Sequence, residues 1–290
     1  MRIIVLILMT ALMPLVSAQN EQTVISFRAG DCTVSVLSEG GGQGNAGLLK
    51  GATPEQLQKY LPDGAFSLQT QVFLVRTPEQ NILIDAGHGK NLFANLQSLA
   101  LEASQIDVIL LTHMHGDHIG GLLRDGKTAF PNAELYIAQA EYDFWNNNGD
   151  RGASQRKIFE IYKEKLHLFV PAEIENVAHT PEIVKGISAV AAYGHTPGHT
   201  AYQLQSAGEK WLIWGDLTHA LPIQMPCPEV ALSFDTDTEK AIASRKKLLE
   251  YIVGNRITAG GMHVPFPAIG TLKRQGDGYA FSPICLCEGI

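Results

Sequence analysis

The densest group of side chains that could do chemistry is His113, His115, Asp117 and His118, which fall within six positions. Imidazole and carboxylate groups are the ligands that transition metals such as zinc take up at neutral pH. The preceding residues 108–112 are apolar and largely β-branched, which predicts a buried strand. Because ligands gather at the carboxyl ends of strands in α/β sheets, the sequence predicts a metal site where this strand ends.

Three further candidate ligands follow at the ends of other strand-like segments. His199 comes after the segment 187–192, Asp216 ends the segment 211–216, and His263 comes after the segment 257–262. Taken alone, each signal is weak, because a single histidine at a strand end is a hydrogen-bonded structural residue as often as it is a metal ligand. As an ordered set, the pattern HxHxDH…H…D…H favours a metal centre over its alternative, a histidine-rich surface loop that binds nothing.

With these residues the chain resembles the metallo-β-lactamase superfamily, and within it the methyl parathion hydrolase and lactonase-like enzymes. The similarity extends over residues 70–283. The stretches that carry it are 112–115, 117–122, 129–133, 143–145, 194–200, 215–219 and 266–270. This resemblance implies an α/β fold, an αβ/βα four-layer sandwich. Strand and helix periodicity alone would also allow a doubly wound sheet.

The resemblance implies a centre of two divalent metal ions. The ligand set that it implies is His113, His115 and His199 for one ion, Asp117, His118 and His263 for the other, and Asp216 as a bridge between them. Five neutral imidazoles favour zinc, with manganese, cobalt and iron as alternatives, because metal supply and site geometry decide as much as affinity. Two such ions that share a water lower its pKa toward neutrality. We therefore expect hydrolysis by a metal-bridging hydroxide.

The resemblance also implies roles for side chains around the ligands. Asp117 and His219 are the expected catalytic groups, His219 as a hydrogen-bond donor to the substrate, with a structural histidine as the alternative. Asp85 and His195 are expected to hold the ligands in place through hydrogen bonds. For Asp85, which precedes Ala-Gly, a turn-forming role is the alternative.

Trp145 and Phe159 are expected to line the substrate pocket, although on helical pattern alone both would be core residues. An apolar pocket with few cations suits a small, neutral, hydrophobic substrate, so we expect cleavage of lactones, esters or phosphotriesters. A β-lactamase or a glyoxalase-II-like thioesterase of the same superfamily is the alternative, and a non-catalytic metal-binding module is another. The bridging carboxylate Asp216, which the β-lactamases lack, argues against a β-lactamase.

Composition and charge describe a single globular domain over residues 19–290. The 290 residues are 45% hydrophobic and 18% charged, and the formal net charge is −7 with no basic run. Nucleic acid is therefore not an expected partner. The resemblance suggests a homodimer. The four cysteines, Cys32, Cys227, Cys285 and Cys287, define no disulfide framework.

Residues 1–18 are typical of a signal peptide. Arg2 supplies the positive end, residues 3–13 are almost wholly apolar, and Val-Ser-Ala at 16–18 is typical of a cleavage site. The apolar stretch is short for a membrane span, so we expect no stable insertion. The mature chain is expected to start near Gln19 and to be periplasmic or secreted, with a retained N-terminal anchor as the alternative.

Strands and helices alternate in two halves. Strands are predicted over 24–27, 32–37, 69–76 and 82–85, and a hairpin over 201–214. Helices are predicted over 91–101, 138–147, 154–166 and 238–253. Another helix is predicted to start after Thr53, because Pro54 and Gln56 complete a capping box.

Overall fold

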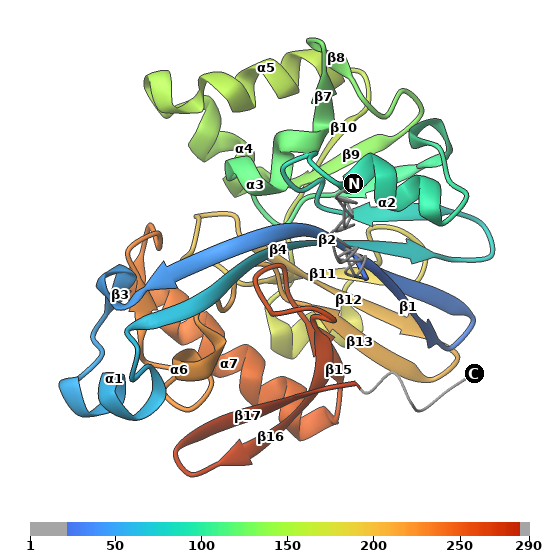
Figure 1. Ribbon diagram of the computed structural model, residues 1–290. Coiled ribbons are helices and arrows are strands. Elements are labelled where there is room, and N and C mark those ends of the chain that lie inside the picture. The colour runs from blue at the N-terminus through green and yellow to red at the C-terminus, as the bar shows by residue number, and fades with distance from the viewer. Residues whose placement is uncertain (1–21, 285–290) are drawn as a thin grey trace, which may run out of the picture.

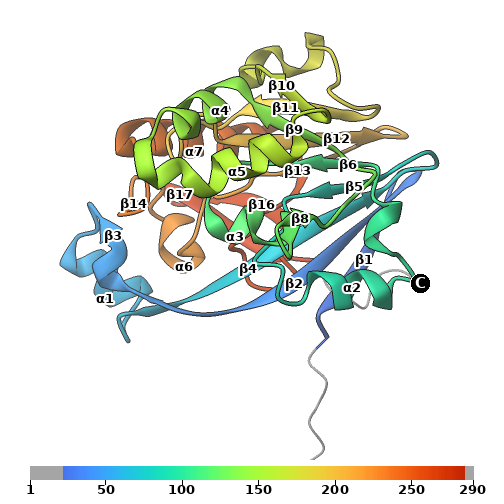
Figure 2. The same ribbon diagram turned by 90° about the horizontal axis from the view of Figure 1, so that it is seen from above.

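Two β-sheets packed face to face form the centre of the computed structural model, which describes residues 22–284 (Figures 1 and 2). The first sheet contains, in spatial order, β1 (Val24–Ala29), β2 (Cys32–Asn45), β4 (Ala65–Arg76), β5 (Asn81–Ile84), β6 (Val108–Leu110), β9 (Glu134–Ala138) and β10 (Leu166–Phe169). The second contains β11 (Ile187–Ala191), β12 (Thr200–Ser206), β13 (Glu209–Ile213), β15 (Thr258–Gly260), β16 (Ile269–Gln275) and β17 (Gly278–Pro283).

Helices cover the outer face of each sheet. The first sheet carries α2 (Leu92–Ser98), α4 (Gln139–Asn146) and α5 (Ala153–Tyr162), and the second carries α7 (Thr238–Asn255), as Figure 1 shows. The shorter elements are α1 (Pro54–Tyr60), α3 (Gly116–Ile119), α6 (Leu221–Gln224), the strand pair β3 (Leu49–Lys50) with β14 (Ala231–Leu232), and the pair β7 (Leu123–Arg124) with β8 (Lys127–Thr128). The predicted αβ/βα four-layer sandwich is confirmed.

Strand β4 shows how the layers are held together. Its side chains alternate, so that Phe73 and Val75 pack toward the second sheet while Val72 and Leu74 pack toward the outer helices. All four are fully buried. Period-2 alternation places every second residue on one face, so a strand with both faces covered must be apolar throughout.

Several predicted boundaries differ from the structure, among them the start of the strand predicted over 69–76, which is Ala65, and the end of the helix predicted over 91–101, which is Ser98. The strand predicted over 32–37 continues to Asn45 through a glycine-rich run, because every residue from Gly40 to Asn45 pairs with β4. Ladder hydrogen bonds therefore outweigh the low strand propensity of glycine. The helix predicted over 154–166 ends at Tyr162, because Leu166 already pairs with Leu135 of β9. The capping box at Thr53 is confirmed by mutual hydrogen bonds with Gln56.

The loops that carry the candidate ligands follow the carboxyl ends of β6, β11, β13 and β15 and meet along one edge of the sandwich. The loop after β5 carries Asp85, which contacts His118 there. Within residues 22–284, no helix is long and apolar enough to cross a membrane. Cys32 and Cys227 are buried free thiols, whereas Cys285 and Cys287 lie outside the described residues. The predicted signal peptide also lies outside them.

Candidate metal centre

Histidine and aspartate side chains converge where these loops meet. One group is His113, His115, His195 and Asp216, and the other is Asp117, His118 and His263. A third set, Asp216, His219 and His263, shares a member with each of them. Within each group the candidate ligand atoms all lie within 4.8 Å of one another. Asp216 lies between the groups, because its Oδ2 atom is 3.2 Å from His195 Nε2 and its Oδ1 atom is 3.2 Å from His118 Nε2.

Short-range structure sets the geometry of each ligand loop. His115 is the N-cap residue of the short helix α3, which carries Asp117 and His118 in its single turn. Asp216 follows Gly215, which has a left-handed φ of 62°. A Cβ atom on Gly215 would lie 2.4 Å from His199 Nε2, so only glycine allows the loops to approach this closely.

The structure corrects the choice between the two histidines of residues 194–200. His199, the predicted ligand, donates from Nδ1 to the carbonyl of Ala192 (2.8 Å) and accepts at Nε2 from the backbone N–H of Asp216 (2.9 Å). Both ring nitrogens are thereby occupied, so no lone pair remains for a metal. His195 takes its place, with Nε2 3.0 Å from Nδ1 of His115.

Buried carboxylates hold two of the candidate ligands from behind. Asp85 lies 2.7 Å from His118 Nδ1 and also accepts the backbone N–H and the hydroxyl of Thr112, both at 2.7 Å. Asp235 lies 3.0 Å from His195 Nδ1. Each contact leaves the Nε2 atom of the histidine facing the cluster. Asp85 is placed as predicted. Asp235 was missed, because a lone aspartate in a loop carries no spacing signal.

The residues present fit divalent cations. His118 Nε2 and Asp216 Oδ1 are buried and face each other at 3.2 Å, yet neither makes a hydrogen bond within the described residues. Such atoms are costly to leave unpaired, and a cation would satisfy both. Burial and the neighbouring His118 hold the pKa of His113 well below its ordinary value, and burial lowers the pKa of His115 to about 4. Both imidazoles are thus neutral at neutral pH, as metal binding requires. By contrast, neighbouring aspartates outweigh burial and raise the pKa of His118, His195 and His263, so that metal binding there would displace a proton.

His219 stands beside the cluster. Its ring stacks on that of His263, with 4.5 Å between centroids and 21° between planes. Imidazole lone pairs lie in the ring plane, so two nearly parallel stacked rings cannot both direct one at the same ion. Burial lowers the pKa of His219 to about 4, and its neutral ring lies 3.1 Å from Asp216 Oδ2 through Nε2. This arrangement suits a hydrogen-bond donor better than a ligand.

A cavity of about 440 Å³ opens onto the cluster. Its apolar wall is formed by Leu68 of β4 and by Phe234, which is 43% exposed. The rest of the lining is His115, Gly116, Asp117, His195, Asp216, His219 and His263. Sequence reasoning missed Leu68 and Phe234, since neither belongs to a motif.

The predicted pocket residues Trp145 and Phe159 do not line this cavity. Trp145 donates from its indole N–H to Glu141 (2.6 Å) and packs edge-on against the ring of His115. Phe159 is buried in the core beneath α4 and α5, in contact with Tyr142. The prediction was wrong because both helices cover the outer face of the sheet and turn their apolar sides inward.

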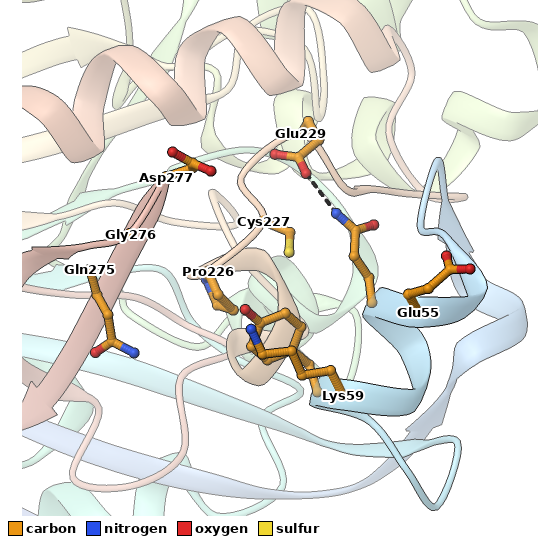
Figure 3. Close-up of a pocket in the computed structure, with 10 residues that line it drawn as sticks. Glu55, Lys59, Pro226, Cys227, Glu229, Gln275, Gly276 and Asp277 are labelled. Carbon is orange, nitrogen blue, oxygen red and sulfur yellow. Dashed lines mark hydrogen bonds between the residues drawn. The ribbon is translucent and has the colours of Figure 1, made fainter.

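A second hollow, of about 420 Å³, lies between α1, α6 and the β16–β17 hairpin (Figure 3). The sulfur of Cys227 points into it, and Gln56 donates to Glu229 at 2.9 Å on its wall. Burial raises the pKa of the Cys227 thiol, which therefore stays protonated. Among the residues that the structure describes, no three metal-ligating side chains meet in this hollow.

Comparison with known proteins gives one matching family model, described as the metallo-beta-lactamase superfamily, over residues 66–255. Atrochrysone carboxyl ACP thioesterase from Passalora fulva is 30% identical over 149 residues, which are 50% of this chain and 37% of that protein. Hydroxyacylglutathione hydrolase from Aeromonas hydrophila is 30% identical over 154 residues, 50% of this chain and 45% of that protein. The chain thus spans less than half the length of these curated relatives.

Two solved structures match nearly the whole chain. AidC, a dizinc quorum-quenching lactonase, superposes with a TM-score of 0.81 at 27% identity, and covers 91% of this chain and 98% of its own. The hydrolase AbOPH superposes with a TM-score of 0.81 at 27% identity, and covers 92% of this chain and 99% of its own.

Proposed function

Because the chain belongs to the metallo-beta-lactamase superfamily, we propose that it is a dinuclear-metal hydrolase that cleaves small, neutral, hydrophobic lactones and esters. The observation that carries this proposal is the pair of ligand groups around the buried carboxylate of Asp216. The similarity to a dizinc lactonase over nearly the whole chain supports a lactone as the preferred substrate. Phosphotriesters, which present a comparable polarised oxygen, are proposed as further substrates.

The centre would hold its two ions with the ligands that face each other. Those ligands are His113, His115 and His195 for one ion, Asp117, His118 and His263 for the other, and Asp216 between them. When bound, the ions supply Lewis acidity toward a carbonyl or phosphoryl oxygen and lower the pKa of water. Zinc is the proposed metal, since imidazole nitrogens predominate.

Two residues of the chain are placed to manage protons and charge. The side chain of Asp117 is 26% exposed, against 2% for Asp216, so it is the more accessible of the two carboxylates that line the cavity. It can take a proton from the attacking water and return it to the leaving oxygen. His219, whose Nε2 lies 3.1 Å from Asp216, can share the N–H of this nitrogen between Asp216 and the oxygen on which negative charge develops.

Leu68 and Phe234 provide the apolar wall that would bind the hydrophobic substituent of the substrate. Phe234 has 43% of its surface exposed. A hydrophobic substituent that covers this ring would lower the free energy of the complex by burying apolar surface. Among the described residues, no lysine or arginine lines the cavity, which suits a neutral substrate.

A thioester is the second candidate substrate, favoured by the relative named as a thioesterase. Export, the homodimer and the native metal stay predictions of the sequence. A β-lactam is included as a test compound, although the bridging carboxylate of Asp216 argues against it.

The test is a substrate panel on purified protein whose metal content is measured. It comprises a simple lactone, an aryl ester, a phosphotriester, an acyl thioester and a β-lactam. We expect the lactone and the ester to be hydrolysed fastest, a strong chelator to abolish turnover, and zinc, cobalt or manganese to restore it. The proposal is overturned if the thioester or the β-lactam is preferred, or if the protein with two bound ions hydrolyses none of the five.

A further inference from the structure

Glu141, on α4, is a fully buried carboxylate that receives four hydrogen bonds. Its Oε1 atom accepts from the backbone N–H of Met114 (2.9 Å) and from the indole N–H of Trp145 (2.6 Å). Its Oε2 atom accepts from the hydroxyl of Thr196 (2.6 Å) and from the backbone N–H of Gly198 (3.0 Å). The two backbone N–H groups and the indole N–H can only donate, and together with the Thr196 hydroxyl they favour the ionised carboxylate, although burial raises its pKa.

These contacts join two loops that are far apart in sequence. Met114 lies between His113 and His115, and Thr196 directly follows His195. The three histidines form one of the two ligand groups. Glu141 therefore ties together the two chain segments that supply the nitrogen ligands of one ion.

The loops have little freedom around this carboxylate. The peptide of Met114 is held on both sides, because its carbonyl accepts from Gln155 Nε2 at 2.8 Å. The second loop packs directly on the helix, since a Cβ atom on Gly198 would lie 2.2 Å from the backbone nitrogen of Glu141. A shift at Glu141 is thus transmitted to both segments.

The ligands of the other ion are held by different groups. His118 is fixed by Asp85, and His263 by the backbone carbonyl of Gln69, which lies 2.5 Å from its Nδ1. The hydrogen bonds of Glu141 reach none of these residues.

We infer that Glu141 is a positioning residue that sets the metal affinity of the His113, His115 and His195 site without setting that of the other site. The inference rests on the two-ion centre of the proposed function. Its physical basis is that loss of an accepting oxygen leaves buried donors unpaired, so the two loops move apart to find partners. Removing such outer partners typically weakens metal binding about 10- to 100-fold.

The test is Glu141→Gln, which keeps the shape of the side chain but replaces one accepting oxygen with an NH₂ group. Metal-free protein is titrated with zinc in competition with a chromophoric chelator, and two dissociation constants are fitted. We expect one constant to rise about 10- to 100-fold and the other to change less than about 3-fold. Asp85→Asn disturbs His118 directly and His113 only through Thr112, so it should weaken chiefly the other site, and the double variant should lose both high-affinity sites.

Glu39→Gln is the matched control. Glu39 is also buried, at 2% exposure, and accepts the backbone N–H groups of Lys90 and Asn91, both at 2.8 Å. The same substitution there should lower stability and leave both zinc constants unchanged. If Glu141→Gln fails to fold, Thr196→Val removes one donor to Glu141 and should weaken the same site to a smaller degree.

The inference is overturned if Glu141→Gln, or Thr196→Val in its place, leaves both constants unchanged or weakens both sites equally. It is also overturned if Glu39→Gln reproduces the effect. The titration does not depend on turnover. Protein that binds two ions but hydrolyses none of the panel substrates would therefore overturn the proposed function and leave this inference standing.

Discussion

Asp235 lies behind His195, with its Oδ1 atom 3.0 Å from the Nδ1 atom of the ring. The opposite ring nitrogen, Nε2, faces Asp216 at 3.2 Å. A carboxylate behind an imidazole fixes the ring orientation and makes the free nitrogen a better ligand. His199, four residues further along, has no such arrangement, because its Nε2 atom accepts the backbone N–H of Asp216.

The first prediction separates these two histidines. His195→Ala should remove one bound ion and most activity, because it deletes a nitrogen that faces the cluster. His199→Gln should retain both ions, because the new amide oxygen can accept the N–H of Asp216, while loss of the second hydrogen bond costs about 1–3 kcal/mol of stability. Elemental analysis and denaturant unfolding of both variants check this. Full metal content in His195→Ala would exclude His195 as a ligand.

The second prediction concerns the pH dependence of metal-free protein. Burial lowers the pKa of His195, but hydrogen bonds to Asp216 and Asp235 raise it from 6.5 to about 9. A raised pKa contributes stability that is fully present below pH 6.5 and is lost as the pH rises through about 9. At about 1.4 kcal/mol per unit, the effect is at most about 3 kcal/mol.

Asp235→Asn removes one of the two charges and should reduce this loss. The free energy of unfolding is measured with urea at pH 6, 7.5 and 9 for both chelator-treated proteins. The difference between variant and unmodified protein is compared across pH, so that the contributions of other histidines largely cancel. An identical pH slope in the variant would show that Asp235 does not hold a proton on His195.

The third prediction concerns Asp216. Its carboxylate lies 3.0 Å from His263 Nε2 and 3.2 Å from His118 Nε2 as well as facing His195, so it would offset charge on both ions. Asp216→Asn should weaken both sites and lower turnover by more than the roughly 10- to 100-fold typical of an outer partner. Metal content and kcat are measured together, with Asp235→Asn as the milder comparison. Normal metal content with near-normal turnover would disprove the bridging role.

The fourth prediction distinguishes pocket from core. Phe234→Ala and Leu68→Ala should raise KM for a hydrophobic lactone roughly 3- to 10-fold with little change in kcat, because the lost contact is similar in the ground and transition states. Phe159→Ala should lower stability by about 3–5 kcal/mol and leave KM unchanged, because its ring is buried in the core. Steady-state kinetics and denaturant unfolding check all three. If only Phe159→Ala changed KM, the substrate pocket would be lined by α4 and α5 and not by Phe234 and Leu68.

Short-range chemistry was readable from the sequence. The run from His113 to His118 places its ligands at one strand end and on one helical turn. These side chains therefore lie close together whatever the rest of the fold is. The capping box at Thr53 and the alternation along β4 are likewise local or periodic patterns, and both were confirmed. The long β2 strand was underestimated, because its glycines form a strand only through pairing with β4.

What tertiary structure alone decided is the direction in which side chains point and which partners they meet. His195 and His199 lie in one loop, and only the packing of that loop against Gly215 and Ala192 turns one ring inward and occupies both nitrogens of the other. Glu141 and Asp235 acquire their positions from contacts with segments 27, 40 and 55 residues away in sequence. Such contacts depend on the packing of the whole sandwich, so the sequence determined the ligand chemistry and the fold determined which ligands, supports and cavity walls are used.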